Sequence, residues 1–295
     1  MLSPAPGAPS PTPLNRLRGL LEEMGSVLVC YSGGVDSAFV LAVAHEVLGP
    51  RAVGMTAISP SLASFEKEAA VALATRIGAR HELVESSEID DPGYQANGVD
   101  RCFYCKSELY RISEKKRAEW GLAFVLNGTN LDDLGDHRPG LDAASRAAVR
   151  SPLVELKFTK ADVRKYAAEI GLSVWDKPAS ACLSSRIPFG TTVTRDRLAQ
   201  IGGLEAELHA LGLRQVRVRW HALSATSGTA GATKEGAIAR IEVAKDELLS
   251  AFDKRDAISA AGRRFGFTYV TLDLEGYRTG SHNEVLVGKS LRIVS

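Results

Sequence analysis

The segment Ser32–Ser37 reads SGGVDS and lies between a run of apolar residues and a segment with helical periodicity. Adjacent glycines let the backbone bring its N–H groups close to an anion, and the start of the following helix adds unpaired N–H donors. The spacing differs from that of the GxxxxGKS/T phosphate loop, whose lysine is absent here. We therefore predict a nucleotide phosphate site; the alternative is an ordinary glycine turn in which Ser37 or Asp36 caps the helix. The predicted phosphate-binding residues are Ser32, Gly33, Gly34, Val35, Asp36 and Ser37.

A second polar segment, residues 127–133, follows another short apolar run. Its place at the end of a predicted strand suits contact with a nucleotide or with Mg²⁺. The same residue types dominate turns, so an Asx-type turn leading into residues 136–140 is an equally good interpretation. The candidate residues are Asn127, Gly128, Thr129, Asp132 and Asp133.

Three of the four cysteines are candidates for chemistry. Cys102 and Cys105 have CxxC spacing at the predicted start of a helix, where thiolate is favoured, and Cys182 lies in a predicted loop. Three thiolates can hold three irons of a cubane cluster and leave the fourth iron open for a sulfide or a substrate. A zinc site would need a fourth ligand, and a thioredoxin-like redox pair does not belong with the glycine-rich loop. Cys30, within an apolar run, is predicted to be a core residue.

Two arginines alternate with valines in residues 216–219. The period of two in a strand places Arg217 and Arg219 on one face, where parallel guanidinium groups would fit a phosphate or a carboxylate. The alternative is a solvated strand face with cross-strand ion pairs. The charged residues that could orient or neutralise these arginines are Glu205, Arg240 and Glu242.

The composition narrows the class of partner. The 295 residues include 36 Lys plus Arg and 35 Asp plus Glu, a net charge of +1, with 45% hydrophobic and 24% charged residues. Proteins that bind nucleic acid or anionic membranes usually carry a basic excess, and four cysteines are too few for a disulfide framework. We therefore expect a cytoplasmic protein that acts on a small molecule and binds neither nucleic acid nor membrane.

These residues must be positioned by elements that alternate in type along the first half of the chain. Short apolar runs predict strands at 27–31, 52–58, 80–84 and 124–126, and helical spacing predicts helices at 38–48, 62–77 and 102–120. Such alternation predicts an α/β fold in which a parallel sheet has helices on both faces, and ligands of such sheets bind at the carboxyl ends of the strands.

The pattern changes after about residue 177. It predicts helices at 196–211 and 245–265, strands at 214–221, 238–243 and 268–272, and a long flexible connection at 222–236. We therefore predict an α/β domain at 15–180 and a smaller α+β domain at 181–295. A disordered proline-rich tail is predicted at 1–14.

Several segments together resemble one known family from about residue 15 to the end of the chain. The chain resembles the LarE family of ATP-dependent sulfur transferases, which make the pyridinium-thiocarboxylate nucleotide of the nickel-pincer cofactor. The resemblance implies a PP-loop ATP-binding domain, a smaller C-terminal domain and a homo-oligomer. The segments that carry it are YSGGVDS (31–37), RCFYCK (101–106), NGTNLDDLGDHRPG (127–140), SPLVELKFTKADVR (151–164), WDKPASACLSSRIPFG (175–190), RVRWH (217–221), ARIEV (239–243) and YVTLDLEGYRTGSHNEVL (269–286).

The resemblance also implies a mechanism. ATP with Mg²⁺ would adenylate a carboxylate of pyridinium-3,5-biscarboxylic acid mononucleotide, and a sulfur nucleophile would then displace AMP to give a thiocarboxylate. Asp36 and Cys182 would be the catalytic residues. By matching position, the residues that bind the substrate would be Ser185, Arg186, Arg217 and Arg219, with Glu205 and Glu242 at matching acidic positions.

The sulfur source divides the family. Some members sacrifice one loop cysteine, which stands where this chain has Ala181, and lack the CxxC. Here Cys102, Cys105 and Cys182 match the other subgroup, which holds a [4Fe-4S] cluster, so we expect a cluster, with single use of Cys182 as the alternative. Two other functions stay open: a PP-loop tRNA thiolase, against which the net charge argues, and a nucleotide-binding or sulfur-carrying module without turnover.

Overall fold

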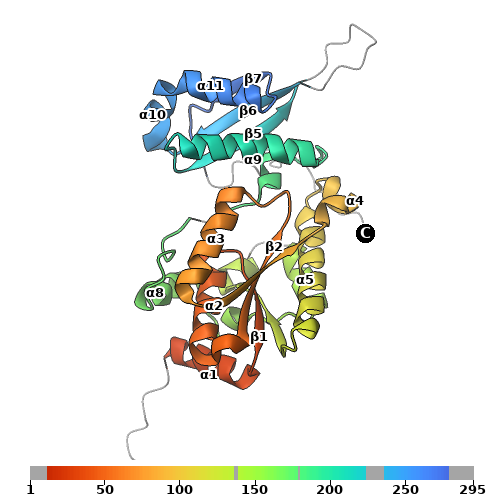
Figure 1. Ribbon diagram of the computed structural model, residues 1–295, viewed down its shortest axis with the longest axis vertical. Helices are drawn as coiled ribbons and strands as arrows, with labels where there is room; N and C mark the ends of the chain where they lie inside the picture. The colour runs from red at the N-terminus through yellow and green to blue at the C-terminus, as the bar shows by residue number, and fades with distance from the viewer. Residues whose placement is uncertain (1–11, 136–138, 179, 224–235, 279–295) are drawn as a thin grey trace, which may run out of the picture. The chain divides into compact units, whose positions relative to one another are not determined.

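The structure is a computed structural model that describes residues 12–135, 139–178, 180–223 and 236–278 (Figure 1). The chain divides into two compact units. Of the described residues, the first unit contains those up to Ser59, Glu66–Glu88 and Cys102–Ser180, and the second contains Pro60–Phe65, Ile89–Arg101 and those from Ala181 onward. The segments Pro60–Phe65 and Ile89–Arg101 therefore group with the second unit. The predicted domains, divided at residue 180, place both segments in the first domain.

The first unit contains a four-stranded parallel sheet with the strand order β3-β2-β1-β4. Val27 pairs with Ala52 in β2 and with Phe124 in β4, so β1 is a central strand. All four strands lie where the apolar runs predicted them, and the parallel sheet confirms the predicted α/β class. Their bounds are β1 (Val27–Cys30), β2 (Ala52–Ile58), β3 (Arg80–Glu85) and β4 (Phe124–Leu126).

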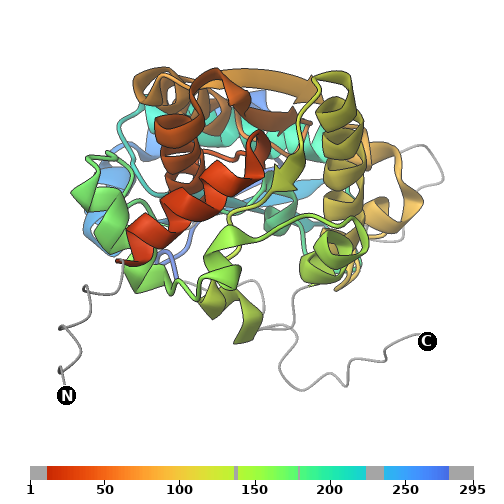
Figure 2. The same cartoon turned by 90° about the horizontal axis from the view of Figure 1, so that it is seen from below.

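Helices cover both faces of this sheet (Figures 1 and 2). Val27 and Val29 of β1 pack with residues of α1, α2, α3 and α8, whereas Leu28 packs with Ile112 of α5. The period of two in the strand thus sends alternate side chains into two separate cores. The helices of this part are α1 (Pro13–Met24), α2 (Val35–Leu48), α3 (Ser64–Ile77), α5 (Arg101–Glu119), α6 (Pro139–Arg146), α7 (Pro152–Glu155) and α8 (Lys160–Glu169).

Helix α1 begins inside the segment that we predicted to be a disordered tail. The Thr12 hydroxyl accepts a hydrogen bond from the Asn15 amide at 3.2 Å, and Pro13 occupies the first turn. Thr followed by Pro is a helix-start signal, and Leu14 and Leu17 are buried at helical spacing. The predicted tail is therefore wrong for residues 12–14, while residues 1–11 lie outside the described part of the chain.

Two glycines allow the loop after β1 to pack closely. Gly33 has φ +72°, and a Cβ there would lie 2.8 Å from the Ala70 Cβ. At Gly128, after β4, a Cβ would lie 2.7 Å from the backbone nitrogen of Ser37 in the first turn of α2. The loop after β4 therefore rests directly on the start of α2, as expected for loops at the carboxyl ends of neighbouring parallel strands.

The second unit contains a three-stranded sheet with the strand order β5-β6-β7. β5 and β6 are antiparallel, with Val218 opposite Ile241, and β6 and β7 are parallel. Of the predicted connection at 222–236, residues 224–235 lie outside the described part of the chain. The elements are α4 (Pro92–Gln95), α9 (Arg195–Ala210), β5 (Val216–Ala222), β6 (Ala237–Val243), α10 (Leu248–Asp253), α11 (Arg255–Arg264) and β7 (Tyr269–Leu272), with a 3₁₀ turn at Leu183–Arg186.

The single helix predicted at 245–265 is wrong, because the segment is broken into a 3₁₀ turn, α10 and α11. Lys254 leaves the helical region with φ −93° and ψ 9°, and its amide bonds back to the end of α10. The break lets α11 pack on β7 so closely that a Cβ at Gly262 would lie 2.3 Å from Val270.

We predict that Gly128→Ala lowers the free energy of unfolding by about 1–3 kcal/mol, because the new methyl group would overlap the backbone of α2. Gly19→Ala, in α1, has nothing within 4 Å of the new atom and should instead stabilise the protein by about 0.5–1 kcal/mol. Chemical denaturation of both variants measures the difference. Equal effects would show that the loop after β4 moves freely away from α2.

Candidate functional site

The predicted phosphate loop is held in place by its own hydroxyl groups. The Ser37 hydroxyl donates to the Gly34 carbonyl at 3.2 Å and accepts from the Ser32 amide at 3.1 Å. Helix α2 begins directly after Gly34, so its first amides and the positive end of its dipole lie at the loop. The structure thus brings residues 32–37 together in the strand–loop–helix arrangement that the sequence predicted.

Asp36 is the centre of a polar group that three separate segments form. Its carboxylate accepts a hydrogen bond from the side-chain amide (Nδ2) of Asn130 at 3.1 Å and pairs with the Lys160 ammonium at 2.5 Å. The backbone amide of Lys160 in turn donates to the Asp132 carboxylate at 2.6 Å. Carboxylates at this edge of the sheet are suitable ligands for a nucleotide-bound Mg²⁺.

Sequence reasoning missed Lys160 and Asn130. Lys160 lies at the first position of α8, after Thr159, whose side chain and Asp162 form a capping box. Hydrogen bonds from Thr159 hold the pKa of Asp162 below its usual range. A cation at a helix N-terminus opposes the helix dipole. That local conflict was the available signal, and the contact with Asp36 explains it.

The other predicted residues of the segment 127–133 serve mainly the turn itself. Asn127 is buried; its side-chain oxygen accepts from the Thr129 amide at 3.1 Å and from the Ser151 hydroxyl at 2.9 Å. The Asp133 carboxylate accepts a hydrogen bond from the backbone amide of Asn130 at 3.1 Å. The Asx-type turn is therefore present, and the Asn130 side chain contacts Asp36, while contact of this segment with a nucleotide or Mg²⁺ stays a prediction.

All four cysteines are thiols in the structure. Cys102 and Cys105 lie in the first turn of α5 in the first unit, and Cys102 is exposed. Cys182, also exposed, lies in the second unit directly before the 3₁₀ turn. Burial raises the pKa of Cys30, whose sulfur lies 3.3 Å from the Ser113 hydroxyl, as expected for a core thiol. Within the described ranges, no group of three or more His, Cys, Asp or Glu side chains is arranged to hold a metal ion.

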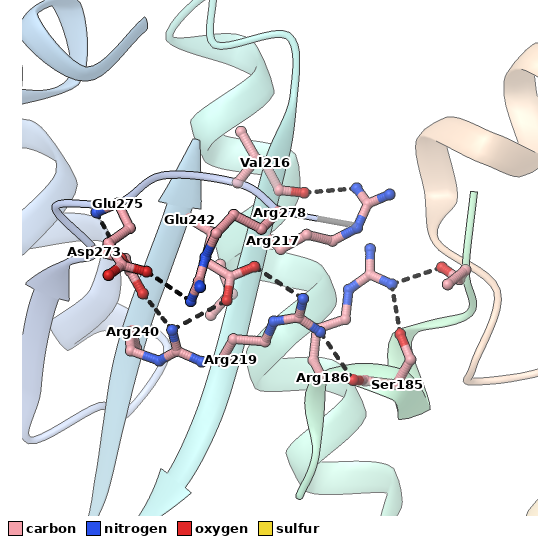
Figure 3. Close-up of polar contacts among 12 residues, drawn as sticks. Ser185, Arg186, Val216, Arg217, Arg219, Arg240, Glu242, Asp273, Glu275 and Arg278 are labelled. Atoms are coloured by element: carbon pink, nitrogen blue, oxygen red, sulfur yellow. Dashed lines mark hydrogen bonds and ion pairs between the residues drawn. The ribbon is translucent and has the colours of Figure 1, made fainter. Parts of the chain in front are cut away.

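Arg186 and Glu205 form a buried ion pair beside Cys182. The guanidinium is 1% exposed and the carboxylate 0%, and two parallel hydrogen bonds of 2.9 and 3.1 Å join them. The remaining terminal nitrogen of Arg186 donates to the carbonyls of Ala181 and Cys182 and to the Ser185 hydroxyl (Figure 3). The predicted substrate ligands Arg186 and Glu205 thus use their hydrogen-bonding groups within the protein.

Arg219 and Arg240 have carboxylate partners in the same unit. Arg219 pairs with the buried Glu242 at 2.8 Å and donates to the Ser185 carbonyl at 3.1 Å. Arg240 pairs with Glu242 at 3.1 Å and also with Asp273 (Figure 3). The cross-strand ion pairs of the alternative interpretation are therefore present, but they lie in a buried network rather than on a solvated face.

Arg217 differs from its neighbours. Only 9% of it is exposed, and its guanidinium donates to the Val216 carbonyl at 2.8 Å and lies over the Tyr277 ring at 5.3 Å. In the described part of the chain no carboxylate makes a hydrogen bond or an ion pair with it. Burial and then the positive charge of Arg186 lower the pKa of Arg217. The negative charge of Glu205 raises this pKa, although Glu205 makes its own hydrogen bonds to Arg186 and Val218. A buried guanidinium of this kind is suited to pairing with an anion.

No protein-family model matches the chain. It is 37% identical over 272 residues to the pyridinium-3,5-bisthiocarboxylic acid mononucleotide synthase of Lactiplantibacillus plantarum, covering 92% of this chain and 94% of that protein. The chain belongs to the LarE family. An uncharacterized protein of Synechocystis sp. is 43% identical over 92% of this chain and 97% of its own length. Another, from Methanocaldococcus jannaschii, is 25% identical over 86% of this chain and 91% of its own length.

Membership of the LarE family confirms the family that the sequence segments suggested. The match to the L. plantarum relative spans both units, so the glycine-rich loop of the first unit and the arginines of the second unit lie within one matched region. The [4Fe-4S] cluster and the roles of individual site residues stay predictions.

We expect Lys160→Met to weaken the binding of Mg·ATP by at least about tenfold, because the loop has no lysine of its own and Lys160 is the cation paired with Asp36. Lys165→Met, on the exposed side of the same helix, is the matched control. Isothermal titration of both variants with Mg·ATP makes the comparison. Unchanged affinity in Lys160→Met would limit that residue to a structural role beside Asp36.

Proposed function

We propose that this chain catalyses ATP-dependent sulfur transfer to pyridinium-3,5-biscarboxylic acid mononucleotide, giving the thiocarboxylate used for a nickel-pincer cofactor. The printed name of the L. plantarum relative supports this substrate class, since that relative makes the bisthiocarboxylic acid mononucleotide. The single structural observation that carries the proposal is Arg217, a buried guanidinium that makes no ion pair with a carboxylate in the described part of the chain. A mononucleotide substrate brings the phosphate that such a site requires.

The first unit would activate the carboxylate. Residues 32–37 would bind the β- and γ-phosphates of ATP, and Asp36 and Asp132 would hold the Mg²⁺ that accompanies them. A substrate carboxylate oxygen then attacks the α-phosphorus, the bond from that phosphorus to the pyrophosphate oxygen breaks, and pyrophosphate leaves. Lys160, beside Asp36, is placed to balance charge on the phosphates during this step.

The second unit would anchor the substrate phosphate. Arg217 offers its guanidinium to the phosphate, while Arg219 stays paired with Glu242 and supports the turn at Ser185. A phosphate would pair with a cation that burial has already removed from water, so little further desolvation of Arg217 is needed. Affinity for the phosphate should therefore depend more on Arg217 than on Arg186, Arg219 or Ser185.

Sulfur then replaces the AMP oxygen. In the proposed route, Cys102, Cys105 and Cys182 would hold three irons of a [4Fe-4S] cluster, because three thiolates are the donor set that leaves one iron open. When bound, the cluster supplies a hydrosulfide at its open iron. A C–S bond forms at the activated carbonyl, the C–O bond to AMP breaks, and AMP leaves.

The alternative route uses Cys182 once. Its thiolate would displace AMP to form a thioester; loss of the proton on its α-carbon and cleavage of its Cβ–S bond would then leave dehydroalanine and release the thiocarboxylate. The exposed position of Cys182 is compatible with this chemistry. Both routes need the same activation step and differ in the source of the sulfur atom: a cluster-borne hydrosulfide in the first, and the Cys182 side chain in the second.

We propose that the protein works in the cytoplasm as a homo-oligomer and that it does not bind nucleic acid. A net charge of +1 supports the last point, because sequence-independent nucleic-acid binding depends on basic residues. In the described residues, no helix combines the length and the apolar character that a membrane crossing needs.

The function is tested by pyrophosphate release. We expect release from ATP only when the biscarboxylate mononucleotide is present, and we expect Arg217→Met to raise the Kd of that substrate about 10- to 100-fold through loss of a hydrogen bond to a charged group. Arg214→Met is the control, since the Arg214 side chain is 81% exposed. Pyrophosphate release without this substrate, or with bulk tRNA in its place, would contradict the proposal.

The sulfur route is tested by metal analysis. Protein purified without oxygen should contain about four irons and four sulfides per chain, and Cys102→Ser should lose most of the iron. Cys30→Ser is the matched control and should keep it, because Cys30 packs in the core beside Ser113. Iron-free wild-type protein that loses the mass of H₂S at Cys182 after turnover would establish the single-use route instead.

A further inference from the structure

The carboxylate of Glu205 joins two parts of the second unit. It projects from the middle of α9 and accepts hydrogen bonds from Arg186 and from the Val218 amide, the latter at 2.9 Å. Val218 stands in β5 between Arg217 and Arg219, and β5 is an edge strand of its sheet. One buried carboxylate therefore contacts both the side chain beside Cys182 and the strand that presents the phosphate-binding arginine.

The turn after Cys182 is held from two directions. Its second half is fixed by other residues: the Leu183 amide donates to the Ser61 carbonyl at 2.9 Å, and Arg101 donates to the Ser184 carbonyl at 2.9 Å. Arg186 holds the residues just before the turn, donating to the Ala181 carbonyl at 2.6 Å and to the Cys182 carbonyl at 3.0 Å; the Ser185 amide and hydroxyl also donate to the Cys182 carbonyl. Arg186 thus fixes the backbone on both sides of the Cys182 side chain.

These contacts leave Arg186 and Glu205 poorly suited to bind substrate. All three guanidinium nitrogens of Arg186 have protein acceptors, and both carboxylate oxygens of Glu205 have protein donors. A substrate anion would have to separate a buried ion pair, which is costly because it leaves an uncompensated charge out of water.

We propose that Arg186 and Glu205 are positioning residues, which hold Cys182 in register with the phosphate site on β5 without contacting the substrate. This inference rests on the proposed function, because it assigns the pair to the sulfur-transfer step. Arg217 binds the substrate phosphate and so fixes the carboxylate end of the substrate, and the pair fixes the backbone of Cys182 against the same strand. Misplacement of a reacting group by about 1 Å can cost about 100-fold in rate.

The test removes both charges together, as Arg186→Met with Glu205→Met, because replacing a buried pair by apolar residues avoids the unpaired charge that a single change would leave. The matched control is Arg264→Met with Glu207→Met, an exposed ion pair that joins α11 to α9, the helix that carries Glu205, with an N–O distance of 3.1 Å. Three quantities are measured in each: the substrate Kd, the rate of substrate-dependent pyrophosphate release, and the rate of thiocarboxylate formation.

We expect the Arg186/Glu205 double variant to bind substrate with a Kd within about twofold of wild type and to release pyrophosphate normally, while thiocarboxylate formation falls about 10- to 100-fold. Loss of active protein would lower both rates equally, so a split between them reports positioning. A raised Kd with both rates reduced would mean that Arg186 binds the substrate, and unchanged thiocarboxylate formation would mean that the pair has no role; either result overturns the inference.

Hydrogen exchange gives a readout that needs no substrate. The Val218 amide loses its acceptor in the double variant and should exchange at least about tenfold faster, with no change at the Leu198 amide, which donates to the Thr194 carbonyl. Unchanged exchange at Val218 would overturn the inference. If wild-type protein releases no pyrophosphate with this substrate, the proposed function fails, and the exchange result still shows whether the pair anchors β5.

Discussion

A guanidinium group removed from water needs both hydrogen-bond acceptors and negative charge, and this requirement organises the second unit. Arg186 meets it with Glu205, and Arg219 meets it with Glu242. Each pair also fixes backbone: the first holds the carbonyls on either side of Cys182, and the second holds the Ser185 carbonyl. The conformation of the cysteine segment is therefore a consequence of how buried charges are satisfied, rather than of local turn propensity.

The first unit follows from a different constraint, the geometry of parallel strands. Loops that follow β1 and β4 emerge at the same edge of the sheet, and the absence of a side chain at Gly128 lets them touch. Asp36 and Asn130 meet there, and the start of α8 adds Lys160 to the group. The loop thereby gains a cation from a residue 124 positions away, whereas the GxxxxGKS/T loop carries its lysine within the motif.

The sequence predicted the parts that depend on local pattern and missed those that depend on long-range pairing. Apolar runs located β1, β2 and β4, whose residues are largely buried, whereas β3 reads RHELVE and is partly exposed at the edge of the sheet. The periodicity of the sequence does not show that Lys160 pairs with Asp36 or that Arg186 pairs with Glu205, because tertiary packing brings each pair together. The resemblance grouped Arg186 with Arg217, and only the contacts separate a paired guanidinium from one without an acid partner.

The difference between the paired arginines and Arg217 also bears on what the near-neutral net charge of the chain says about its ligands. A net charge of +1 hides a local arrangement in which the buried Arg186 and Arg219 pair with Glu205 and Glu242, whereas in the described residues no carboxylate pairs with Arg217. A protein that bound polyanions by charge alone would need many unmatched cations at its surface. In the described residues Arg217 is a buried guanidinium on a strand that makes no ion pair, an arrangement suited to a single phosphate group rather than to a polyanion. Its role in binding a mononucleotide stays a prediction.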